Sequence, residues 1–161
     1  EASYIRNFVF GVEDSLVSTV GVLSGIAIAN VPQGTILLTG TILILVEAFS
    51  MAAGSFLSEH SAEGYVHQET APLRRSLIAA SIMFFSYFIS GFVPLVPDLL
   101  FGGSIAFWAA IICSLGALLV LGIIGGKLSN TDLVSSAVRM TVVGGIAIAL
   151  GVGAGVLIPT Q

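Results

Sequence analysis

Residues 46–61 read VEAFSMAAGSFLSEHS and combine a strongly apolar sequence with a carboxylate and a thioether. It closes a long apolar run, and the chain turns polar at Ser58. Glu47 lies inside the apolar run, and Met51 follows one helical turn later. A carboxylate is hard to solvate in such surroundings, so its presence calls for an explanation beyond packing.

The apolar character extends over the whole chain. Of its 161 residues, 56% are hydrophobic and only 9% are charged, and the mean hydropathy is +1.07. A soluble domain carries about 25% charged residues. Lipid is therefore the expected solvent for most of the chain, which we interpret as one all-α membrane domain covering residues 1–161.

Five apolar segments are long enough to cross a bilayer core, which takes about 20 helical residues. They cover residues 9–30, 34–57, 77–96, 105–124 and 137–158. The segments are too long for barrel strands and lack their alternation. Pro32 and Gly34 indicate a tight turn after the first segment. Pro94 and Pro97, followed by Gly102-Gly103, are expected to end the third segment and turn the chain back. Residues 58–76 are expected to form a short cytoplasmic loop.

The basic residues predict the orientation. With five crossings, the N-terminus and the second and fourth connections share one side of the membrane. All five lysines and arginines fall on that side: Arg6, Arg74, Arg75, Lys127 and Arg139. Cytoplasmic loops carry the excess of Lys and Arg. We therefore expect the N-terminus in the cytoplasm and the C-terminus outside.

Acidic side chains within the first two segments are candidates for function. Glu47 lies past the middle of the second segment, and Asp14 lies about one turn inside the first. Glu13, beside it, is expected to be solvated near the interface. An acid at the centre of a membrane helix costs about 2.5–3.5 kcal/mol, and such groups usually face the bundle interior or a water-filled cavity. The structural alternatives are an interhelical hydrogen bond for Glu47 and an apolar filler role for Met51.

Asp14, Glu47 and Met51 together predict a metal pathway. Because the first two segments are antiparallel, Asp14 and Met51 are expected at similar depths, and Glu47 shares a helix face with Met51. Carboxylates bind hard and borderline cations, and a thioether adds a soft donor. The set favours a transported Fe²⁺ or Mn²⁺ and requires no permanently bound cofactor. Asp14 and Glu47 are also the candidate proton carriers.

The second connection contains a possible collection site for metal. Glu59, Glu63 and His67 follow i, i+4 spacing, so one helical face could present two carboxylates and an imidazole. The alternative is a solvated extension of the second helix. No phosphate-binding glycine motif occurs, so we expect neither ATP-driven pumping nor an enzyme. No nucleic-acid partner is expected.

Glycine pairs at GxxxG spacing favour close helix contacts. They occur at residues 21/25, 122/126 and 151/155. Five helices are few to enclose a path alone. A homodimer with the path on its twofold axis would double the ligand set.

Four motifs together resemble the vacuolar iron transporter family. Residues 10–16, FGVEDSL, are similar to the opening of the family's first helix, and residues 50–57, SMAAGSFL, to its S-M-x-x-G-x-Y-L motif. Residues 94–97, PLVP, and the pair Gly144-Gly145 match the third and fifth helices. The resemblance implies five helices per subunit, a homodimer and the exchange of metal for protons, with Asp14 and Met51 as the pathway residues.

The chain also departs from the family. Ser15 and Phe56 replace the usual glycine and tyrosine, and Leu43 stands where plant-type members carry a glutamate. Glu47, one turn away, is a hypothetical substitute. The long cytoplasmic metal-binding domain of plant-type members is reduced to residues 58–76, which favours a prokaryotic plasma membrane over an organelle membrane.

The resemblance and the ligand set favour a proton-coupled exporter of divalent transition metals from the cytosol. The main alternative is a non-transporting membrane scaffold or assembly subunit whose buried acids pair with a partner's helices. A carrier for a small organic cation is a third alternative, but it would leave Met51 unexplained.

Overall fold

The computed structural model describes all residues except 1, 30, 68–72, 129–130 and 159–161, and it leaves the side chains of residues 2 and 63–67 undescribed. Its five α-helices are α1 (Ala2–Ile28), α2 (Gln33–His67), α3 (Leu73–Leu100), α4 (Gly103–Leu128) and α5 (Leu133–Leu157). All five are long and apolar enough to cross a membrane. The predicted fold class, a five-helix all-α membrane protein, is confirmed.

The helices differ from the predicted spans chiefly in length. α2 continues ten residues past residue 57, to His67, and α3 already begins at Leu73, so most of the expected 58–76 loop is helical. Leaving the hydrocarbon region does not end a helix whose sequence still favours one. At 1.5 Å per residue, the extension projects about 15 Å beyond the predicted end of the span. The backbone of residues 58–67 therefore has the form of an extended second helix, which is the alternative considered for this segment.

Pro94 and Pro97 lie inside α3, which continues to Leu100, so the expectation that they end the third span is wrong. A proline removes one backbone donor from a helix. Neighbouring helices and Ser side chains tolerate this loss inside membrane bundles. Both prolines are buried within the packed bundle. The chain reverses after Leu100, at the glycine pair named in the prediction, and Gly103 has a φ of +62° that suits glycine.

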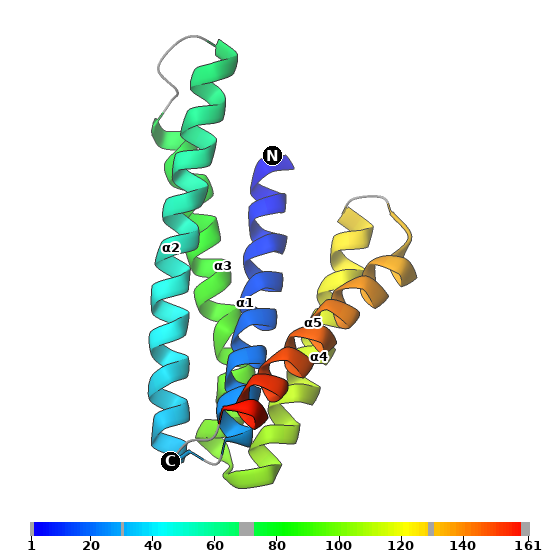
Figure 1. The fold of residues 1–161 in the computed structure, drawn as a ribbon. Helices are drawn as coiled ribbons and strands as arrows, with labels where there is room; N and C mark the ends of the chain where they lie inside the picture. Colours follow the sequence, from blue (N-terminus) through cyan, green and yellow to red (C-terminus); the bar gives the residue numbers. More distant parts are fainter. Residues whose placement is uncertain (1, 30, 68–72, 129–130, 159–161) are drawn as a thin grey trace.

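α3 lies between α1 and α2, and α5 packs against the opposite side of α1 and against α4 (Figure 1). A buried apolar cluster joins the first three helices through Leu23, Ile36, Ile44 and Leu95. Large apolar side chains such as Phe49, Ile105 and Leu150 are more than half exposed on the outer faces of α2, α4 and α5. This distribution fits helices whose outer faces contact lipid.

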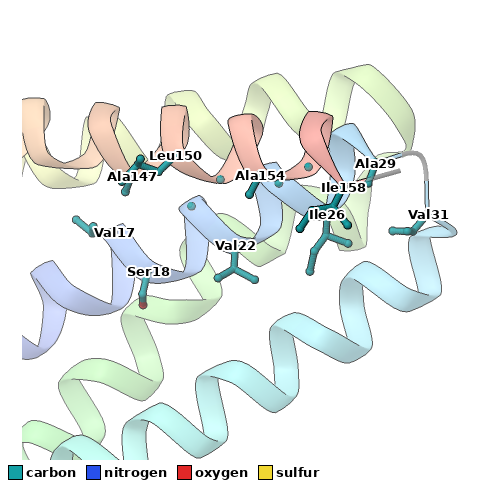
Figure 2. Close-up of a pocket in the computed structure, with 14 residues that line it drawn as sticks. Val17, Ser18, Val22, Ile26, Ala29, Val31, Ala147, Leu150, Ala154 and Ile158 are labelled. Carbon is teal, nitrogen blue, oxygen red and sulfur yellow. The ribbon is translucent and has the colours of Figure 1, made fainter. Parts of the chain in front are cut away.

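Glycine and alanine residues form the contact between α1 and α5. A Cβ added at Gly25 would lie 2.5 Å from the carbonyl oxygen of Gly151, and one at Gly155 would meet the carbonyl oxygen of Gly25. Two of the predicted GxxxG pairs therefore pack against each other within this chain. Figure 2 shows the groove beside this contact, with Val22, Ile26 and Leu150 among its labelled apolar side chains.

Candidate metal pathway

Two hydrogen bonds set the register between α1 and α2. The Ser3 hydroxyl donates to the Glu59 carboxylate at 2.9 Å, and the Asn7 amide donates to the Ser55 hydroxyl at 3.1 Å. These pairs step four residues along each antiparallel helix. Continuing by the same step places Gly11 at the level of Met51, and Ser15 at the level of Glu47.

This register brings Asp14 to the level of Glu47 rather than Met51. Met51 lies four residues from Glu47, which is about 6 Å nearer the Arg6 end of the bundle. The carboxylates of Asp14 and Glu47 are close enough to interact electrostatically, and both side chains are only half-buried. Glu13 is half-buried beside Asp14 rather than fully solvated. The register therefore places the two predicted proton carriers at about the same level on adjacent helices.

Tyr87 of α3 completes this layer, and sequence reasoning missed it. Its side chain is fully buried, and its hydroxyl is 2.7 Å from the Ser18 hydroxyl. Ser18 lies one turn after Asp14 on the same face of α1. The Tyr87 hydroxyl also interacts electrostatically with Asp14 and Glu47. The polar spacing of Asp14 and Ser18 could have indicated a partner here, but nothing in the sequence identified which helix supplies it.

Met51 lines a pocket of about 650 Å³ at the Arg6 end of α1 and α2. Ser50, Gly54 and Ser58 of α2 line the same pocket, and Asn7 lines it from α1. Other residues in the wall include a second thioether, Met83 of α3, which is 3% exposed. Sequence reasoning missed Met83 because a methionine in an apolar run looks like ordinary core.

Glu59 belongs to a cluster that joins three helices at the same end. Its carboxylate accepts from Ser3 of α1 and lies 3.9 Å from both the Arg6 and the Arg75 guanidinium groups. The Glu59 side chain is only 12% exposed. Glu63 and His67 lie in the last part of α2, but their side chains are outside the described part of the chain. The predicted collection face is therefore seen only at Glu59, which is already ion-paired.

The ligand set within one subunit is small. Across the described residues, no group of three or more His, Cys, Asp or Glu side chains could hold a metal ion. The groove in Figure 2 adds no candidate, because apolar residues and glycines line it except for Ser18. The α2 face that holds Ser50 and Gly54 is exposed, so the region beside Met51 is open on one side.

Comparisons with known proteins agree on one family. A sequence model of the VIT family matches residues 5–78 and 66–156. Vacuolar iron transporter homolog 3 of Arabidopsis thaliana is 29% identical over 165 residues, covering 94% of this chain and 82% of that protein. Vacuolar iron transporter homolog 1 of Oryza sativa subsp. japonica is 28% identical over 174 residues, covering 94% and 72%.

Vacuolar iron transporter homolog 1 of Arabidopsis thaliana is 28% identical over 173 residues, covering 99% of this chain and 86% of that protein. The similarity thus includes both the α1–α2 layer and the remaining helices. With the family model matching nearly the whole length, this five-helix membrane chain belongs to the VIT family.

Proposed function

We propose that the protein is a proton-coupled exporter of divalent transition metals, with Fe²⁺ as the main substrate and Mn²⁺ as a second one. The observation that carries the proposal is the α1–α2 layer, in which Asp14 and Glu47 lie at one level and Met51 lies one turn nearer the Arg6 end. The names of the plant relatives, which describe iron transporters, support the choice of metal.

The chemistry of exchange follows from the two carboxylates. Removing a carboxylate from water disfavours its charged form unless a cation or a proton neutralises it. Asp14 and Glu47 would therefore hold either a metal ion or protons. Met51 adds a soft donor that favours Fe²⁺ over Mg²⁺ or Ca²⁺. Metal would bind from the Arg6 end, which the positive-inside rule assigns to the cytosol, and protons would return from the other side.

A homodimer would complete the ligand set. One subunit offers two carboxylates and one or two thioethers on a face that is open on one side. A twofold axis beside that face would pair Asp14 and Met51 with their counterparts. Crosslinking of a cysteine placed at exposed Ser50 tests this arrangement. Dimer-sized product in the membrane is the expected result, and only monomer would contradict it.

The pathway is tested by metal uptake in proteoliposomes under a pH gradient. We expect Asp14→Ala and Met51→Ala to reduce Fe²⁺ flux at least tenfold. Met140→Ala is the matched control, because it removes a thioether from α5 that does not line the Met51 pocket. Wild-type flux in the first two variants would exclude the pathway.

Proton coupling is tested separately with Glu47→Gln. We expect metal flux to become insensitive to the pH gradient, because the amide cannot exchange a proton. Unchanged coupling would reduce Glu47 to a structural role.

A scaffold role is the competing function. It predicts no metal binding by the purified chain, so a Co²⁺ titration separates it from transport without any flux measurement.

The collection role of Glu59, Glu63 and His67 is also a proposal. A metal ion would have to displace the arginines from Glu59. Glu63→Gln combined with His67→Ala should raise the metal concentration needed for half-maximal flux without changing the maximal rate. An unchanged half-maximal concentration would remove the collection role.

We further propose a plasma membrane in a prokaryotic cell as the location. The alternative, an organelle membrane, has the support of the plant relatives, whose names include the word vacuolar. Imaging of a tagged chain in its own cell decides between the two membranes.

A further inference from the structure

Asp98 is a buried carboxylate that the proposed pathway does not use. It lies in the last turn of α3, at the end of the bundle opposite Arg6, and only 5% of its surface is exposed. From Tyr87 to Asp98 is eleven residues, which is about 16 Å along the helix axis. Asp98 is therefore separate from the layer that holds Asp14 and Glu47.

Asp98 lines a pocket of about 490 Å³ formed by the ends of α1 and α3 and the starts of α2 and α4. Gln33, Ser104 and Trp108 share this pocket. The Gln33 amide nitrogen donates to the backbone carbonyl oxygens of Asp98 and Phe101, the latter at 2.8 Å. Its nitrogen is thus committed, and its amide oxygen remains available as an acceptor.

In the part of the chain that the structure describes, no cationic side chain lies close enough to neutralise Asp98. Among the described residues, no group donates a hydrogen bond to its carboxylate and no charged group lies near it. The chain has five lysines and arginines and two histidines, and all seven fall on the Arg6 side in the sequence. A buried carboxylate without a partner is costly, so its charge must be balanced by a cation from solution or removed by a proton.

We propose that Asp98, with the Gln33 amide oxygen and the Ser104 hydroxyl, forms a second divalent-cation site at the end of the bundle opposite Met51. All of its donors are oxygens, which suit hard and borderline divalent ions. It lacks the thioether of the Met51 pocket, so it binds Fe²⁺ and Co²⁺ more weakly. In the proposed export function, this would be the site from which metal leaves, and that role rests on the proposed function. The binding of a cation to this site does not depend on the export function.

The only tryptophan of the chain, Trp108, lines the same pocket and reports on it directly. The experiment titrates Co²⁺ into the purified full-length chain in a neutral detergent at fixed pH, and it measures tryptophan fluorescence. A neutral detergent excludes binding to lipid phosphates. We expect saturable quenching in the wild type and at least tenfold weaker quenching in Asp98→Asn.

Two further variants make the result specific. Asp132→Asn, at the N-cap of α5 on the Arg6 side, retains a capping residue and should quench as the wild type does. Asp98→Glu retains the carboxylate and should quench within about threefold of the wild type, which separates loss of the ligand from misfolding. Quenching of Asp98→Asn that equals the wild type would overturn the proposal, as would loss of quenching in Asp132→Asn.

The Asp14→Asn, Met51→Ala double variant distinguishes this proposal from the proposed function. It should lose metal flux but retain the quenching of Trp108. If the double variant transports normally, the assignment of the pathway fails while the Asp98 site stands. If it loses both flux and quenching, Trp108 reports the Met51 pocket and the Asp98 site is refuted.

Discussion

The contact between α1 and α5 offers the sharpest test of the fold. Gly25→Ala adds one methyl group where the helices are closest. The added Cβ would lie 2.5 Å from the carbonyl oxygen of Gly151 and 3.0 Å from its carbonyl carbon. Both atoms belong to the backbone, so neither can rotate away, and the two helices must separate.

The size of that separation follows from the distances. Ordinary van der Waals contact begins at 3.4 Å, so the oxygen is too close by about 0.9 Å. Moving the helices apart by this amount also weakens the neighbouring contacts of Gly21 with Ala147 and of Gly155 with Ile28. Overpacking of this kind costs about 1–3 kcal/mol.

Gly153→Ala is the matched control because nothing lies within 4 Å of a Cβ added at Gly153. Both substitutions exchange glycine for alanine inside a helix, so both gain the same intrinsic helix propensity of about 1 kcal/mol. The difference between the two variants therefore isolates the contact with α5. We expect Gly25→Ala to be less stable than Gly153→Ala by about 2 kcal/mol.

Thermal unfolding in detergent, followed by circular dichroism, measures this difference. For a chain of this size, each kcal/mol corresponds to about 2–4 °C in Tm, so the two variants should differ by about 4–8 °C. Equal melting temperatures would refute the reasoning, since they would mean that the two helices do not approach at Gly25.

Three further predictions concern polar contacts. Tyr87→Phe should lower the free energy of unfolding by about 1 kcal/mol, because the Ser18 hydroxyl loses its partner. In a double-mutant cycle, adding Ser18→Ala to Tyr87→Phe should lower the free energy of unfolding only slightly further. Losses of stability that add up in the double variant would contradict the hydrogen bond. Glu59→Gln should lower stability by less than about 1 kcal/mol, because its arginine partners are largely exposed; a larger loss in denaturant unfolding would contradict this. Gln33→Leu should lower the free energy of unfolding by about 1–3 kcal/mol, because the carbonyl groups of Asp98 and Phe101 lose their donor. It should also speed amide hydrogen exchange at the start of α4, and unchanged exchange would contradict this prediction.

Length and hydropathy alone predicted the number and class of the helices. This succeeds because a membrane helix must satisfy every backbone polar group internally, so an apolar run of about 20 residues has few alternatives. The ends of the helices were less predictable. Pro94 and Pro97 lie inside α3, although proline is a typical helix-ending signal, because membrane helices tolerate proline where the surrounding bundle allows it.

The candidate site divides in the same way. The sequence singled out Asp14, Glu47 and Met51, because ionisable and thioether groups stand out in an apolar background. It placed Asp14 level with Met51, whereas the register set by the Asn7–Ser55 hydrogen bond places it level with Glu47. A shift of one helical turn cannot be predicted from hydropathy, which is nearly constant along a membrane helix.

Composition and hydropathy were enough to predict that this chain spans a membrane with five helices and that three acids, Glu13, Asp14 and Glu47, lie inside the first two. Both follow from the transfer free energies of single side chains, which do not depend on neighbours. The packing of the helices was needed to show that Tyr87 joins Asp14 and Glu47, that Met83 lines the Met51 pocket, and that two glycine pairs meet between α1 and α5. It also showed that Asp98 lies in a pocket without a cationic partner among the described residues. These features depend on the rotation and register of the packed helices. Because lipid is as apolar as the helix side chains, rotation and register are set by close packing and hydrogen bonds between the helices.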